Sequence, residues 1–361
     1  MTAVRQLTSR YEHPFAQALE KAGQGLPVAG MTSNTVPWEL LRAAGYFPLM
    51  LNPGVGPRPF ADRFMEDGVF TPRIRGVFDG IASGAWPFLK LLVIPRTSGQ
   101  EHKLFLYLRE LARQGLSTGM PELYLYNLLH TRSAEARQYG LRRTEDFRNH
   151  LRAGDLVCAV EESNKARRAV RALLDLRRDR APRLNGTVAI ALIGAMYFMD
   201  RAAYAGLAME AAAELSNAEP LRGPRILIKG SPLHHTGLHS AIESHGAVVV
   251  AEDDWWGSRA MSEEIPEHGN LLREIFQTYN RDAPSPRDGS DDWFMSASAV
   301  VDGVVFYLPP EDDVLGWDYP RLRQALDERG TPHLLVREDA SEELSPECHQ
   351  RIHDFVRKLG A

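Results

Sequence analysis

Hydroxyl and carboxyl side chains follow the first strongly apolar segment of this chain, in the sequence GMTSNTVPWE at Gly30–Glu39. Ser33 and nearby backbone N–H groups could hold a carbonyl oxygen, while Glu39 could act as a general acid or base. The same residue types also suit the start of a helix, with Asn34 or Thr35 as its cap and Glu39 at the positive end of its dipole. The pattern therefore leaves a catalytic and a purely structural interpretation open.

Histidines follow a later apolar segment, in the sequence GSPLHHTGLH at Gly230–His239. His235 and His239 lie four residues apart and would share one face of a helix, a spacing compatible with metal ligands, and Glu252 could add a carboxylate. Alternatively, His234 caps the helix and the other two histidines face solvent or a carboxylate. No HExxH-type signature supports the metal site, so the sequence favours the second interpretation.

The elements that must position these side chains alternate between short apolar runs and longer helical patterns, which is typical of parallel α/β folds. Strands are expected at Pro27–Met31, Tyr46–Leu51, Leu89–Pro95, Glu122–Leu128, Arg225–Lys229, Ala247–Ala251, Gly303–Leu308 and His333–Arg337. Helices are expected between the strands, among them Gln100–Gln114 and His235–His245. Right-handed crossovers would bring the loops after the strands to one edge of each sheet, where open α/β folds bind ligands.

The predicted fold class is therefore α/β, with two Rossmann-like parallel-sheet lobes joined by a helical region. The expected domains are an N-terminal lobe at 1–150, connecting helices at 151–222 and a C-terminal lobe at 223–361. A chain of 361 residues is long enough for two such lobes.

Composition excludes several classes of protein. The formal net charge of −5 gives no general attraction to nucleic acid or to an anionic membrane. No apolar run approaches the roughly 18 to 20 residues of a membrane helix, and the N-terminus shows no signal-peptide core. Two cysteines cannot make a disulfide framework, so the expected location is the reducing cytoplasm.

Six stretches, in this order along the chain, resemble the paired subunits of 2-hydroxyacyl-CoA dehydratases and benzoyl-CoA reductases. They are Val36–Leu51 (VPWELLRAAGYFPLML), Val93–Leu111, Glu161–Arg178, Arg225–Leu233 (RILIKGSPL), Val248–Arg259 (VVVAEDDWWGSR) and Gly303–Asp339. The resemblance implies two Rossmann-like lobes, a pocket between them for a CoA thioester, and a heteromeric enzyme. It also implies a [4Fe-4S] cluster held by cysteines from both lobes.

The cysteines that this resemblance implies are missing from the chain. The positions that match the family's cluster ligands fall near Phe70-Thr71-Pro72, on Ser98, on Trp255 and near Asp312. A [4Fe-4S] cluster needs about four thiolates, or three with one open iron site, and oxygen ligands are poor substitutes. The two cysteines present, Cys158 and Cys348, fall in helical patterns, where a small buried thiol is usual.

Two further features allow more than one interpretation. The adjacent Trp255 and Trp256 are expected to be covered by other groups. They could fill the cleft, form a subunit interface, or stack on an aromatic acyl group or the adenine of CoA. The arginine-rich stretch Arg167–Arg183 could clamp CoA phosphates. A solvated basic face is its more ordinary role.

The sequence thus predicts one subunit of a dehydratase/reductase-like complex that acts on a CoA thioester without its own [4Fe-4S] cluster. Ser33 and Glu39 are the expected catalytic residues, and the expected substrate-binding residues are Ser98, Ser231, Asp254 and Trp255. The expected partners are a homologous subunit, which could carry a [4Fe-4S] cluster, and the acyl-CoA substrate. The alternatives are a non-catalytic scaffold or regulatory subunit, and a cluster-independent enzyme that uses carboxylates or a histidine-bound metal.

Overall fold

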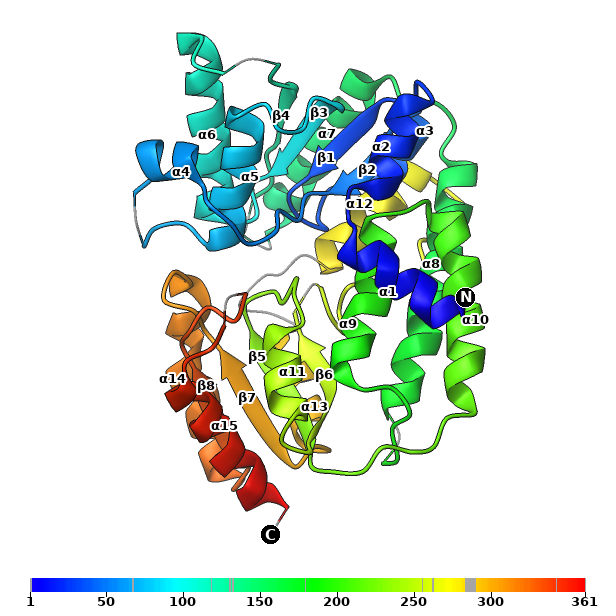
Figure 1. Cartoon of the computed structure of the whole chain (residues 1–361). Helices are drawn as coiled ribbons and strands as arrows, with labels where there is room; N and C mark the ends of the chain where they lie inside the picture. Colours follow the sequence, from blue (N-terminus) through cyan, green and yellow to red (C-terminus); the bar gives the residue numbers. More distant parts are fainter. Residues whose placement is uncertain are drawn as a thin grey trace.

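Two four-stranded sheets, one in each half of the chain, form the framework of the computed structural model (Figure 1). The first sheet has the order β2-β1-β3-β4, the second has the equivalent order β6-β5-β7-β8, and all neighbouring strands are parallel. The structure describes residues 2–66, 68–117, 119–129, 131, 133–178, 180–254, 256–261, 263–282, 290–341 and 343–360. The predicted α/β class with two parallel-sheet lobes is confirmed.

The strands coincide with the apolar runs of the sequence. They are β1 (Val28–Met31), β2 (Phe47–Met50), β3 (Leu89–Pro95), β4 (Glu122–Tyr126), β5 (Arg225–Gly230), β6 (Val248–Asp253), β7 (Gly303–Tyr307) and β8 (His333–Val336). In β3 every residue except Lys90 is buried. Such a continuous apolar run is expected for a parallel strand that helices cover on both faces.

Helices pack on both faces of the first sheet. They are α2 (Ala16–Gly23), α3 (Trp38–Ala43), α4 (Pro59–Phe64), α5 (Pro72–Ala82), α6 (Gly99–Gln114) and α7 (Ala134–Leu151), whereas α1 (Ala3–Glu12) packs on the helices that connect the two lobes. Side chains of α5 and α6 share one core cluster with β2 and β3, while side chains of α3 and α7 share another with β1 and β4. The loops after β1 and β3 lead directly into α3 and α6, so these two helices begin at the carboxyl edge of the sheet.

A group of helices joins the lobes on one side of the molecule (Figure 1). It consists of α8 (Val157–Arg178), α9 (Gly186–Gly194), the 3-10 turn η1 (Ala195–Tyr197) and α10 (Arg201–Ser216). The second sheet is covered by α11 (Gly237–Glu243) and α15 (Pro346–Leu359) on one face, and by α13 (Ser290–Ser298) and α14 (Asp313–Glu328) on the other. No helix in the part of the chain described is long and apolar enough to cross a bilayer.

Helix α12 (Leu271–Asp282) belongs to the C-terminal half of the sequence but packs on the N-terminal lobe. Its residue Ile275 belongs to the core cluster of β1 and α3. The hydroxyl of Tyr279 accepts a hydrogen bond of 3.1 Å from the backbone N–H of Trp38, at the start of α3. The expectation that Asn34 or Thr35 caps this helix is wrong, because Pro37 occupies the N-cap position and a distant tyrosine satisfies the first N–H group.

Candidate functional site between the lobes

The loops that follow the strands of the two sheets meet between the lobes. The carbonyl oxygen of His234, after β5, accepts hydrogen bonds from Tyr11 Oη at 2.7 Å and from Asn52 Nδ2, after β2, at 3.3 Å. Gln100 Nε2, after β3, donates to the carbonyl oxygen of Glu311, after β7, at 3.2 Å. The carboxyl edges of both sheets therefore face one another, as open α/β folds require for a ligand site.

Ser33 and Glu39, the expected catalytic residues, lie in the first loop and the first turn of α3, and both are buried. Ser33 Oγ lies 2.8 Å from Thr35 Oγ1. Glu39 accepts a hydrogen bond from Ser163 Oγ of α8 and lies 3.3 Å from the guanidinium of Arg201 at the start of α10. Glu39 is thus directed toward the connecting helices, while Ser33 bonds within its own loop.

Ser98 and Ser231 occupy strand-end loops, as expected for substrate-binding residues. Ser98 is the N-cap of α6 and accepts from the N–H of Glu101 at 3.1 Å. Ser231 donates to the carboxylate of Asp312, which is itself the N-cap of α14 and accepts from Leu315 N–H at 3.0 Å. Both serines therefore already have structural hydrogen bonds across or within these loops.

Sequence reasoning missed a buried polar group next to these loops, formed by Glu101, Thr32 and Arg73. Glu101 accepts from Thr32 Oγ1 at 2.9 Å and from the N–H of Thr97 at 3.3 Å. Burial raises the pKa of Glu101, and the two threonines and Arg73 oppose that rise. Burial likewise lowers the pKa of Arg73 to about 10. A local signal existed, because Glu101 follows the capping Ser98 by three residues, the spacing of a capping box.

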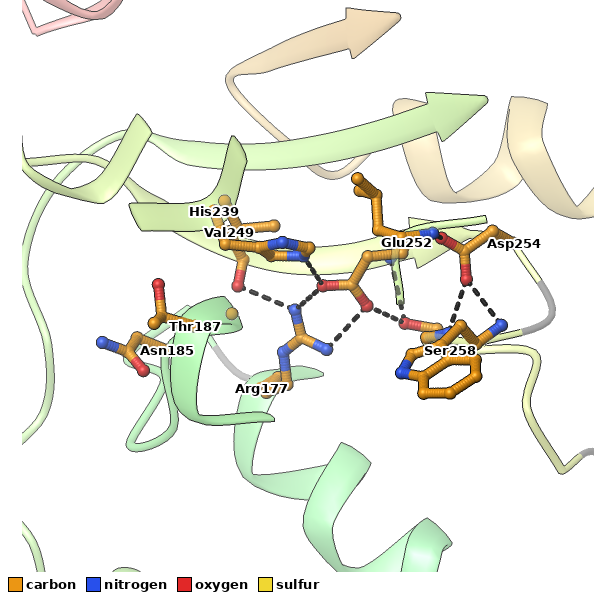
Figure 2. A network of polar contacts seen from close by, with 12 residues as sticks. Arg177, Asn185, Thr187, His239, Val249, Glu252, Asp254 and Ser258 are labelled. Carbon is orange, nitrogen blue, oxygen red and sulfur yellow. Dashed lines mark hydrogen bonds and ion pairs between the residues drawn. The ribbon is translucent and has the colours of Figure 1, made fainter. Parts of the chain in front are cut away.

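His239 and Glu252, two members of the alternative metal site, belong to a buried ion network (Figure 2). His239 Nε2 lies 3.0 Å from Glu252 Oε1, and Arg177 Nη1 of α8 donates to Glu252 Oε2 at 2.9 Å. Burial raises the pKa of Glu252, but the charges of Arg177 and His239 outweigh burial and hold it at about 2. The expectation that His239 faces a carboxylate is confirmed, but the expectation that His234 caps the helix is wrong, because Thr236 occupies the N-cap position of α11.

His235 stands apart from this network. Burial lowers its pKa to about 4, and its ring lies 6.4 Å from that of Tyr307. Among the residues whose placement is described, no group of three or more His, Cys, Asp or Glu side chains is arranged to hold a metal ion. The oxygens of Glu252 are engaged by Arg177, His239 and Ser258 instead.

Asp254 lies at the end of β6, where its carboxylate accepts three backbone hydrogen bonds. The donors are Leu233 at 3.1 Å, Trp256 at 2.8 Å and Gly257 at 2.5 Å. Burial, together with the charge of Glu252, raises the pKa of Asp254 to about 7 in spite of these hydrogen bonds. A carboxyl group that titrates near neutral pH therefore lies at the edge of the interlobe region.

Of the two adjacent tryptophans, Trp255 lies outside the described residues. Trp256 is fully buried, with its ring 4.7 Å from Tyr197 and 6.2 Å from His234. Tyr197 belongs to the connecting helices and His234 to the C-terminal lobe, so Trp256 fills space where these parts meet. This agrees with the interpretation of Trp256 as a cleft-filling side chain.

Two expectations about helix α8 are wrong. Cys158 is exposed rather than buried, whereas Cys348 on α15 is buried as expected. Arg167 and Arg177 are buried rather than solvated. Arg177 donates to the carbonyl oxygen of Val249 on β6 at 2.9 Å, and Arg167 Nη1 donates to that of Glu263 at 2.9 Å. Both cations are therefore bound to distant parts of the chain instead of water.

Comparison with known proteins identifies relatives of the same kind as the sequence motifs indicated. The family model described as 2-hydroxyglutaryl-CoA dehydratase, D-component, matches residues 34–359. The beta subunit of (R)-phenyllactyl-CoA dehydratase from Clostridium sporogenes is 22% identical over 171 residues. That match covers 45% of this chain and 46% of the relative, which is less than half the length of either protein. The family resemblance is thereby confirmed.

Replacing Arg177 with Met should strongly lower the free energy of unfolding. Glu252 would keep its charge in a fully buried site without its main cation, and such losses cost about 3 to 5 kcal/mol. The exposed pair Arg113–Glu110 is the matched control, since Arg113→Met should cost about 0 to 1 kcal/mol. Urea unfolding measures both; equal losses in the two variants would contradict the importance of the buried pair.

Asp254→Asn should change how stability depends on pH. Because the pKa of Asp254 rises from 3.8 to about 7 on folding, the folded protein holds this proton more tightly than the unfolded chain. The resulting stability is present below pH 4 and is lost as pH rises through 7, at about 1.4 kcal/mol per pKa unit. The free energy of unfolding should therefore fall between pH 5 and pH 8 more in the wild type than in the variant. Asp62→Asn, at an exposed site, should show no such difference.

Proposed function

Since the chain belongs to the 2-hydroxyglutaryl-CoA dehydratase D-component family, we propose that it is one subunit of an acyl-CoA-processing complex. In this proposal it helps to bind a CoA thioester and works without a [4Fe-4S] cluster of its own. A homologous partner subunit holds the cluster, if the reaction uses one. The complex acts in the cytoplasm, in keeping with a chain that has only two cysteines.

The observation that carries the cluster-free part of the proposal is the use of three expected ligand positions as helix caps. Thr71 accepts from the N–H of Ile74 at 3.4 Å and caps α5, while Ser98 caps α6 and Asp312 caps α14. These oxygen atoms are poor ligands for iron in an iron–sulfur cluster. Cys158 and Cys348 lie on α8 and α15, away from these caps along the chain. The residues present therefore do not fit a [4Fe-4S] cluster.

The proposed thioester site comprises Ser33 and Glu39 as catalytic residues and Ser98, Ser231, Asp254 and Trp255 as substrate-binding residues. Ser33, Ser98, Ser231 and Asp254 follow the ends of four different strands, where a ligand between the lobes would contact them. Glu39 Oε2 is buried and has no hydrogen-bond partner among the residues described, which supports a role in accepting a proton or a ligand hydrogen bond. The partner is proposed because the relative from Clostridium sporogenes is named as a beta subunit.

A scaffold or regulatory subunit is the second candidate. It is favoured by the way Glu39 is held between Ser163 and Arg201, because such a carboxylate could serve folding alone. The third candidate, an enzyme with a histidine-bound metal, has no comparable support, since Arg177 occupies the Glu252 oxygens that a metal would need.

Purification of the tagged chain from its native host should recover a cysteine-rich relative in equal amount. Iron and acid-labile sulfide should be found in the relative after the subunits are separated, because its thiolates suit a cluster and this chain's oxygen atoms do not. Metal analysis of the separated subunits measures the distribution. Stoichiometric iron on this chain alone, with the visible absorption of a cluster, would refute the proposal.

Ser33→Ala and Glu39→Gln separate the catalytic role from the scaffold role in the purified complex. A carbonyl-binding hydroxyl or an acid–base carboxyl contributes about 10²- to 10⁴-fold to turnover, so both variants should lose activity on that scale. Ser163→Ala is the control for packing, since it removes a hydrogen bond to Glu39 from outside the site. Full activity in the first two variants, with assembly intact, would favour the scaffold.

A further inference from the structure

The side chain of Gln100 joins three segments that come from both lobes. Its Oε1 accepts a hydrogen bond of 2.8 Å from the N–H of Thr71, and its Nε2 donates one of 3.2 Å to the carbonyl oxygen of Glu311. The orientation of the carboxamide is fixed by these partners, because a flipped amide would set donor against donor and acceptor against acceptor. Gln100 therefore links α5, α6 and the loop before α14 through one group.

The three linked segments are each anchored by a helix cap. Thr71 caps α5, Ser98 caps α6 two residues before Gln100, and Asp312 caps α14 directly after Glu311. The caps tie each loop to its own helix, while the bond from Gln100 to Glu311 crosses from one lobe to the other. Two further hydrogen bonds, from Tyr11 on α1 and from Asn52 in the loop after β2, converge on the carbonyl oxygen of His234.

The position of this link suits it to resist separation of the lobes. Helices α6 and α14 lie on the side of the molecule opposite the connecting helices α8 and α10 (Figure 1). If the lobes move apart about the connecting helices, separation is greatest on the side of Gln100. The hydrogen bond from Gln100 to Glu311 therefore opposes separation of the lobes more effectively than a hydrogen bond close to the connecting helices would.

We infer that Gln100 is a positioning residue that holds the two lobes closed, by joining Thr71, α6 and Glu311 without any inorganic group. These are the segments that the family's cluster ligands would occupy, so a side-chain amide takes over the linking role. The closure is a property of the chain alone and does not rest on the proposed function. If the Gln100 link fails its test, the proposed function still stands or falls by the purification and activity experiments, and the reverse also holds.

Two substitutions dissect the link. Gln100→Leu removes both hydrogen bonds, whereas Gln100→Glu keeps an acceptor for Thr71 N–H and removes the donor to Glu311. Gln100→Leu should raise the population of the open state roughly fivefold, the change expected for one typical net hydrogen bond. Gln100→Glu should raise it at least as much, because its carboxylate would face the carbonyl oxygen of Glu311 with no donor between them. Gln114→Leu is the matched control, because Gln114 lies exposed on the same helix and bonds only to Glu110 among the contacts described.

Residue-resolved hydrogen exchange of the full chain measures this change. Within residues 308–315, the amides of Leu308 and of residues 311–315 should exchange at least roughly fivefold faster in both Gln100 variants, while those of α15 and those of the Gln114 variant stay at the wild-type rate. The Thr71 amide should lose protection in the Leu variant and keep it in the Glu variant. Unchanged exchange at 308–315, or an equal rise in α15 that reports general loosening, would overturn the inference.

Iron removal provides the complementary test. The wild-type chain, treated with an iron chelator under reducing conditions, should show the same exchange at residues 308–315 as the untreated chain. Faster exchange after chelation would mean that a bound metal group closes the cleft, and the assignment to Gln100 would fail.

Discussion

Buried charge at the carboxyl ends of the second sheet is the constraint on which the rest of the structure depends. Arg177 and Glu252 are both fully buried, and the loss of either would leave the other as an uncompensated buried charge. Arg177 comes from α8 and Glu252 from β6, so pairing their charges fixes the connecting helices to the C-terminal lobe (Figure 2). Asp253, the next residue, faces two further cations, Lys229 at the end of β5 and Arg259 at 2.9 Å. The strand ends are thus held rigidly before any ligand is considered.

This rigid edge explains why Asp254 differs from its neighbours. Glu252 and Asp253 have cationic partners, whereas the contacts of Asp254 in the described part of the chain are backbone N–H groups. Hydrogen bonds to N–H groups offset burial less than a full opposite charge does, and the negative charge of Glu252 adds to the cost of ionising Asp254. The same ion network that secures the fold therefore leaves one carboxyl group with a pKa of about 7 at the edge of the interlobe region.

Much of the fold could be predicted because its signals are local. Continuous apolar runs such as Leu89–Pro95 marked the strands, and a right-handed crossover then fixed which ends face the cleft. The errors concern features set by distant residues. Arg177 is buried because Glu252 lies 75 residues further along, and α3 is capped by Tyr279, 241 residues away from Trp38. No local pattern carries that information, and α12 crosses to the N-terminal lobe for the same reason, through packing of residues such as Ile275.

Site residues were harder to predict than strands because one side-chain type serves both roles. A serine at a strand end caps a helix or binds a substrate with the same oxygen, and Ser98 demonstrably caps. Capping satisfies N–H groups within one lobe but cannot span the cleft. The group at the Gln100 position must meet the N–H of Thr71 on one side and the carbonyl oxygen of Glu311 on the other, which a carboxylate cannot do because it only accepts. A serine or threonine hydroxyl could do both, but its short side chain reaches less far. A glutamine carboxamide has a donor and an acceptor at the end of a long side chain, and that chemistry makes Gln100 suited to a place where thiolates are absent.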